Sequence, residues 1–265
     1  MNMFSKILSA VLAGAMVFGT ALEAAAPQHN AGGTLFLVNR QYMISSAYEP
    51  PELSAAEVPG SVREMRPEAA RALEEMFAAC KEETGKTLIS VSGYRSWAKQ
   101  NRLYQRKLKS VKRNAAKAQE YVAPPGASEH QTGLAMDLGQ RGKPTLGSNF
   151  GKTEGGQWIR ENCWRFGFIL RYDEGWEAVT GYKYEPWHVR YVGKEAAQEI
   201  HAANVPFETW LTDYRVRRLR EILAGPLPGE TEKEEAAETA PEDTGEAAEE
   251  TETIPEITEP EGNIG

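Results

Sequence analysis

The chain has 265 residues, 41% of them hydrophobic and 26% charged, and its formal net charge is −8. The negative charge is concentrated at one end. Residues 226–265 hold fourteen acidic residues and one lysine, which leaves about +5 on residues 1–225. That mild positive charge would suit an anionic polymer, and the absence of a basic motif argues against nucleic acid as a partner. The two cysteines form no CxxC pair, which excludes a cysteine-built zinc site. Cys80 and Cys163 could pair or remain free.

The two ends of the chain differ from a folded domain. Residues 1–26 contain Lys6, continue with an apolar run of about a dozen residues and end in Ala24-Ala25-Ala26. This is the pattern of a cleaved secretory signal peptide, and the run is shorter than the roughly 20 residues that a retained membrane anchor needs. Residues 225–265 are too acidic and too poor in apolar side chains to form a core. We therefore predict a disordered acidic tail at 225–265 and one folded domain at 34–224.

The first half of this domain begins with a short apolar run, which predicts a strand at 34–38. Apolar residues three and four apart then predict an amphipathic helix at 68–84, with Pro67 before it and a glycine after it. A strand is expected at 87–91. The next segment, 96–118, is rich in lysine and arginine and predicts one long helix.

The second half continues the mixture of helices and strands. We expect strands at 134–138, 168–172 and 187–192 and helices at 156–166, 194–203 and 207–223. The order lacks the regular strand–helix–strand alternation of a parallel sheet. It predicts an α+β fold, in which a single domain has a small antiparallel sheet flanked by helices.

Two of the four histidines lie close to carboxylates in the sequence. His130 begins an eight-residue stretch that ends at Asp137, and His188 follows Glu185 by three positions. A hydrolytic zinc site needs three protein ligands from histidines and carboxylates, with a fourth position open. It also needs a carboxylate that does not bind the metal and can move a proton. His130, Asp137 and His188 could be the ligands, with Glu185 as the proton carrier. Alternatively, the histidines are ordinary polar residues satisfied by hydrogen bonds.

The local backbone sets conditions on such a site. Gly133 permits a turn between His130 and Asp137. In a straight strand, Glu185 and His188 would point to opposite faces. Because Pro186 lies between them, we predict that Glu185 lies in a bend before the strand.

Three motifs in this order resemble the VanY-type D-alanyl-D-alanine carboxypeptidases: Ser-Gly-Tyr-Arg-Ser, Ser-x-His-x-x-Gly-x-Ala-x-Asp and Glu-x-x-His. The resemblance covers roughly residues 35–192. It implies a zinc D,D-peptidase-like fold with one zinc ion per chain, bound by His130, Asp137 and His188. It also implies that metal-activated water removes the terminal D-alanine from peptidoglycan stem peptides, with Glu185 as general base and then acid.

The resemblance further implies that Arg95, Gln100 and Ser128 contact the substrate. A guanidinium is a two-pronged donor that suits the free C-terminal carboxylate a carboxypeptidase must recognise. Arg95 could instead stabilise the developing oxyanion or form a structural salt bridge. Ser128 could equally cap a turn.

Other functions share part of this pattern. Related enzymes with the same motifs include L,D-carboxypeptidases that act on tetrapeptide stems. From a different class, a non-catalytic, zinc-bearing wall-binding module would have no need of Glu185. The expected signal peptide places the protein in the cell envelope or outside the cell. We expect a monomer with no stable membrane span after signal cleavage, whose partner is the stem peptide of peptidoglycan.

Overall fold

The computed structural model describes residues 26–143 and 146–224. Residues 1–25 of the expected signal peptide and the expected tail at 225–265 lie outside this part, so those predictions and the domain limits stay predictions. Within the described residues, the helices are too short or too polar to cross a membrane.

The centre of the fold is a four-stranded sheet with the strand order β3-β4-β6-β5. All its neighbouring strands are antiparallel, and a second sheet consists of one short antiparallel pair. This arrangement confirms the predicted α+β fold with small antiparallel sheets. The strands are β1 (Ser54–Ala55), β2 (Glu64–Met65), β3 (Leu88–Ser92), β4 (Ala135–Gln140), β5 (Phe168–Leu170) and β6 (His188–Tyr191).

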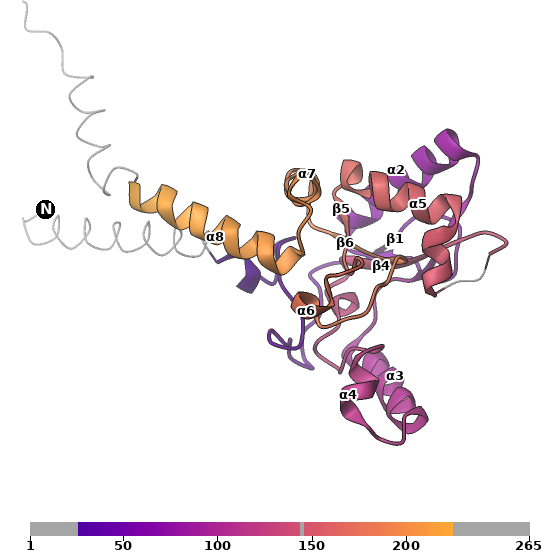
Figure 1. The fold of residues 1–265 in the computed structure, drawn as a ribbon, viewed down its shortest axis with the longest axis horizontal. Helices are drawn as coiled ribbons and strands as arrows, with labels where there is room; N and C mark the ends of the chain where they lie inside the picture. The colour runs from indigo at the N-terminus through magenta and orange to yellow at the C-terminus, as the bar shows by residue number, and fades with distance from the viewer. Residues whose placement is uncertain (1–25, 144–145, 225–265) are drawn as a thin grey trace, which may run out of the picture. The chain divides into compact units, whose positions relative to one another are not determined.

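Helices pack against this sheet and against one another. The α-helices are α2 (Pro67–Thr84), α3 (Trp97–Ser110), α4 (Ala115–Gln119), α5 (Glu154–Asn162), α6 (Glu177–Thr180), α7 (Lys194–Ala203) and α8 (Phe207–Ala224). In Figure 1, α2 and α5 lie side by side, and both contact the sheet. The pair α3 and α4 projects away from it. Short 3-10 helices are η1 (Pro27–His29), η2 (Glu129–Thr132), η3 (Ser148–Lys152) and η4 (Cys163–Phe166).

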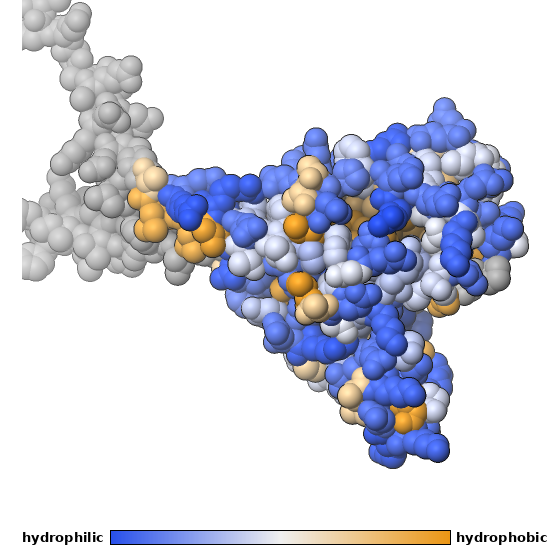
Figure 2. Space-filling model, viewed as in Figure 1, coloured by the Kyte–Doolittle hydropathy of each residue, from blue (hydrophilic) through white to orange (hydrophobic). Residues whose placement is uncertain are grey.

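Two apolar clusters form the core. The larger joins α2 to the sheet and α5, through residues such as Leu73, Leu138 and Ile159, all fully buried. The smaller cluster joins Ile169 of β5 to α7 and α8, through Ile200 and Phe207. Hydrophilic side chains dominate the face drawn in Figure 2, and hydrophobic ones gather near the end of α8. These clusters fix the sheet on which the chemistry-bearing residues lie.

The long helix expected at 96–118 is wrong, because the structure breaks it after Ser110. Lys112 and Arg113 adopt left-handed φ angles of 55° and 61°, and a separate helix, α4, begins at Ala115. The side chain of Asn114 accepts a hydrogen bond from a backbone N–H of α4, as an N-terminal cap does. Residues 96–118 contain no glycine or proline, so the sequence gave no sign of the break.

The strand expected at 34–38 is also wrong. The segment is buried at Phe36, but its backbone joins no strand. Instead the guanidinium of Arg190 donates hydrogen bonds to the carbonyls of Thr34 and Phe36, at 3.0 and 2.7 Å. A side chain thus satisfies the polar groups that a neighbouring strand would otherwise pair.

The remaining expected elements agree with the structure within a few residues. The helix expected at 156–166 is α5 followed by the 3-10 helix η4. Cys80 and Cys163 are buried free thiols, so of the two possibilities they do not pair.

Candidate metal centre

Asp137 lies on β4, in the middle of the sheet, where strand pairing sets its neighbours. It is the direct cross-strand partner of Ser92 on β3 and of His188 on β6. Directly opposed residues of an antiparallel pair place their side chains on the same face. An irregularity between Ser90 and Ser92 shifts the register of β3 at this point, and such bulges often lie beside functional sites. The pairing therefore carries His188, 51 positions away, to Asp137.

His130 reaches the same place from η2, the 3-10 helix that precedes β4. Gly133 ends η2 with a φ of 73°, which confirms the expected turn. The Nδ1 atom of His130 lies 2.8 Å from the carbonyl oxygen of Gly93. A Cβ atom at Gly93 would lie 2.4 Å from the backbone oxygen of Glu64, so only glycine allows the backbone at position 93 to lie this close to Glu64. The contact leaves Nε2 of His130 facing Asp137.

The three side chains have the spacing of a metal site. Asp137 Oδ1 lies 3.2 Å from His130 Nε2 and 3.0 Å from His188 Nδ1. One donor atom from each residue lies within 4.8 Å of the others, and all three residues are buried. Zn–N and Zn–O bonds of about 2.0–2.1 Å at tetrahedral angles would place neighbouring ligand atoms about 3.3 Å apart. The donor set of two imidazoles and one carboxylate fits zinc.

Electrostatics distinguish the two imidazoles. Burial, assisted by the positive charge of Arg95, lowers the pKa of His130 to about 4, so this ring is neutral at physiological pH. Burial also opposes protonation of His188. However, its hydrogen bonds to Asp137 and Glu129 outweigh burial and raise its pKa to about 9 in the metal-free protein. The pKa of Asp137 lies well below its usual range because the neighbouring imidazoles outweigh its burial. Its carboxylate is therefore ionised.

Glu185 lies in the bend that the sequence predicts. Its N–H donates to the carbonyl of Tyr172, and its carbonyl accepts from the N–H of His188 at 3.0 Å. This second bond closes a tight turn through Pro186 just before β6. Burial, with the nearby charge of Asp137 adding to it and His188 opposing it, raises the pKa of Glu185 to about 7. A carboxyl group with this pKa can both accept and donate a proton near neutral pH.

The three residues expected to contact substrate lie around the same cavity, which has a volume of about 260 Å³. Arg95 Nη1 lies 3.6 Å from Asp137 Oδ2, and its Nη2 lies 3.5 Å from the hydroxyl oxygen of Ser128. Ser128 makes no side-chain capping bond to η2. Gln100 donates from its amide to the carbonyl of Ala123. Glu185 and the three candidate ligands line this cavity too.

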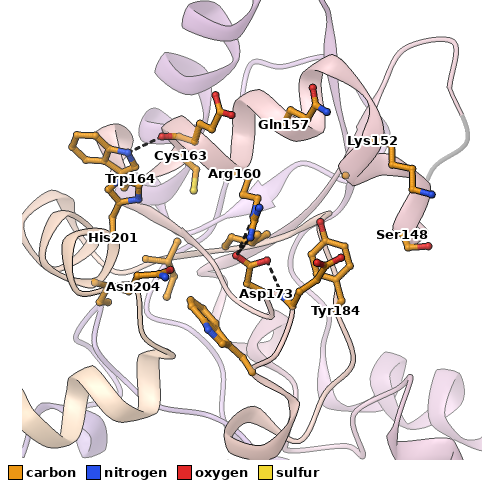
Figure 3. A pocket seen from close by; sticks show the side chains of 17 residues that line it. Ser148, Lys152, Gln157, Arg160, Cys163, Trp164, Asp173, Tyr184, His201 and Asn204 are labelled. Carbon is orange, nitrogen blue, oxygen red and sulfur yellow. Dashed lines mark hydrogen bonds and ion pairs between the residues drawn. The ribbon is translucent and has the colours of Figure 1, made fainter.

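A larger cavity, of about 790 Å³, lies elsewhere (Figure 3). Its charged groups include Arg160 and Asp173, which form an ion pair at 3.0 Å, and Trp164 stacks on His201 in its wall. None of the candidate metal ligands lines it. The chemistry-bearing residues therefore belong to the smaller cavity.

Sequence reasoning missed a buried charge cluster behind the site. Glu129, Arg171 and Arg190 are almost inaccessible to solvent. Glu129 contacts both arginines and lies 3.4 Å from Nε2 of His188. Charged residues are usually exposed, so nothing in the sequence marked these three as buried. The position of Glu129 next to His130 was the one available signal.

Comparisons with known proteins show which family the chain resembles. The family model for VanY D-alanyl-D-alanine carboxypeptidase matches residues 62–194. The chain is 44% identical over 188 residues to a putative carboxypeptidase, YodJ, from Bacillus subtilis, covering 68% of each protein.

Two solved structures are similar to the chain. The LdcB LD-carboxypeptidase is 44% identical, with a TM-score of 0.65, over 69% of this chain and 87% of that one. A mutant of the vancomycin-resistance D,D-pentapeptidase VanY in complex with Zn(II) is 36% identical, with a TM-score of 0.58. That match covers 67% of this chain and 98% of the other. The family match, the zinc-bound relative and the three candidate ligands together identify the chain as a hydrolytic metallo-carboxypeptidase with a zinc cofactor. The chain belongs to the VanY D-alanyl-D-alanine carboxypeptidase family.

Proposed function

We propose that the protein removes the C-terminal D-alanine from peptidoglycan stem peptides in the cell envelope or outside the cell. The strongest support is that donor atoms of two imidazoles and a carboxylate lie within 4.8 Å of one another beside a cavity that Glu185 also lines. His130, Asp137 and His188 would hold the zinc ion. When bound, zinc would polarise the scissile carbonyl and lower the pKa of a water molecule.

Glu185 is the proposed general base and acid. As a carboxylate it takes a proton from the attacking water and then gives it to the departing amine of D-alanine, so no covalent intermediate is needed. A nearby positive charge lowers the pKa of a carboxyl group, so the ionised form is expected at neutral pH in the zinc-loaded enzyme. The turn through Pro186 holds the carboxylate at the cavity wall.

Arg95 is the proposed recognition group for the free carboxylate of the substrate. Its Nη1 donates a hydrogen bond to the hydroxyl oxygen of Ser92 at 3.1 Å, while its contacts with Asp137 and Ser128 are longer, at 3.6 and 3.5 Å. Its Nε has no partner among the described residues. It therefore keeps donors for an incoming carboxylate. Among the described residues, the amide oxygen of Gln100 also has no hydrogen-bond partner. It could accept a hydrogen bond from an N–H group of the peptide.

Two specificities fit this site. A D,D-carboxypeptidase releases D-alanine from a pentapeptide stem that ends in D-Ala-D-Ala. An L,D-carboxypeptidase releases the same residue from a tetrapeptide, so it must accept a residue of opposite chirality before the cleaved bond. The VanY motifs led us to expect the first. The higher identity and TM-score of the LdcB match favour the second.

A stem-peptide assay tests the function and separates these candidates. The zinc-loaded protein is incubated with pentapeptide and tetrapeptide stems, and released D-alanine is measured by mass spectrometry. Conversion of pentapeptide to tetrapeptide supports D,D-activity, and conversion of tetrapeptide to tripeptide supports L,D-activity. Amidation of the C-terminal carboxylate should abolish release of the terminal residue, measured then as D-alaninamide, in either case, because Arg95 loses its partner. If neither free-acid stem is shortened, the proposal fails.

Substitution of Glu185 tests the proton carrier. Because general acid–base catalysis contributes typically about 10²–10⁴-fold, Glu185→Gln should lower kcat by about that factor on the preferred stem. The zinc content should remain that of the wild type, since Glu185 is not a proposed ligand. Glu174→Gln, which changes an exposed carboxylate in the turn between β5 and α6, is the matched control and should retain activity. Wild-type turnover by Glu185→Gln would rule out the assigned role.

The pH dependence of zinc affinity tests the proposed ligands. Without metal, His188 has a pKa of about 9 and is protonated at neutral pH, so zinc must displace this proton to bind Nδ1. One proton released per zinc makes the affinity rise about tenfold per pH unit. The rise should extend from about pH 7 to about pH 9, where the metal-free ring becomes neutral, and then flatten. Competition with a chromophoric chelator measures it, and a pH-independent affinity over this range would contradict the assignment.

A further inference from the structure

The charge cluster behind the metal centre has an arrangement that the proposed reaction does not require. Glu129 lies on η2, directly before His130, and its side chain is completely buried. One of its oxygens, Oε1, lies 2.8 Å from Arg171 Nε and 3.1 Å from Arg190 Nη1. The other, Oε2, lies 3.4 Å from Nε2 of His188. The carboxylate thus uses one oxygen for the two arginines and directs the other at a candidate ligand.

The two candidate histidine ligands are held through opposite ring nitrogens. His130 contacts the carbonyl of Gly93 through Nδ1 and faces Asp137 with Nε2. His188 faces Asp137 with Nδ1 and Glu129 with Nε2. A neutral imidazole carries its proton on one nitrogen only, and the acceptor at that nitrogen decides which lone pair is free for a metal. For His188, the only acceptor at Nε2 in the described residues is Glu129.

We infer that Glu129 is a positioning residue that holds the proton of His188 on Nε2 and so presents Nδ1 to the zinc ion. This inference rests on the zinc site of the proposed function. The negative charge of Glu129 makes it a stronger acceptor than a backbone carbonyl. Arg171 and Arg190 hold the carboxylate in place. Glu129 therefore acts on the metal through His188 and does not itself touch it.

A second carboxylate that contacts Arg171 supplies a matched control. Glu208, at the start of α8, forms a second ion pair with Arg171 and has no contact with His188. Glu208→Gln and Glu129→Gln each remove one negative charge from the same arginine, but only Glu129→Gln weakens the acceptor beside His188. A purely structural role for Glu129 would make the two variants alike in zinc binding.

The test compares the zinc affinity of the two variants with that of the wild type, each shown to be folded by circular dichroism. Loss of a hydrogen-bond partner behind a metal ligand typically weakens binding about 10- to 100-fold. We expect a loss of that size for Glu129→Gln and a change within about threefold for Glu208→Gln. Equal affinities of wild type and Glu129→Gln would overturn this inference alone. Failure of the wild type to bind zinc would overturn the proposed site as well.

A second measurement needs no change at Glu129, in case that variant does not fold. With only four histidines in the chain, imidazole ¹⁵N spectra of the zinc-loaded wild type can be assigned with His29→Gln and His201→Gln variants. We expect one zinc-bound ring protonated on Nδ1, which is His130, and one protonated on Nε2, which is His188. Two zinc-bound rings that both carry the proton on Nδ1 would overturn the inference.

Discussion

The pairing of Asp137 with His188 across β4 and β6 is the constraint on which the candidate metal centre depends. It places a carboxylate oxygen 3.0 Å from one imidazole, and η2 brings a second imidazole to within 3.2 Å of the same oxygen. A slip of one residue in the register would turn Asp137 to the opposite face of the sheet. The apolar clusters on both sides of the sheet hold that register. The core of the protein therefore determines the geometry of its chemistry.

Next to the candidate ligands, the fold buries charged side chains, each of which contacts a side chain of opposite charge. An isolated buried ion is strongly disfavoured, and removal of one partner leaves the other uncompensated. Glu129 meets Arg171 and Arg190, and Arg171 also meets Glu208 on α8. Arg190 in turn binds the carbonyls of Thr34 and Phe36. Through these contacts, the cluster connects residues 34–36 and helix α8 to the metal centre. Neither segment holds a candidate ligand.

The residues that the structure brings together at the candidate site, and much of the fold, could be predicted from the sequence, for separate reasons. His130, Asp137, His188 and Glu185 were recognisable because zinc chemistry restricts residue types and because Pro186 required a bend, which the structure contains. Gly85 marked the end of α2 correctly. What could not be predicted depended on distant contacts. The backbone near Phe36 pairs with the side chain of Arg190, and the burial of Glu129 depends on arginines some 40 or more positions away.

We propose that two distant stretches of chain hold one zinc ion between them. Anomalous diffraction at the zinc edge, from crystals of the zinc-loaded protein, tests it most directly. We predict one strong peak per chain, about 2.0–2.2 Å from His130 Nε2, Asp137 Oδ1 and His188 Nδ1. A peak at any other group, or a cavity in which these three side chains remain without metal at saturating zinc, would contradict it.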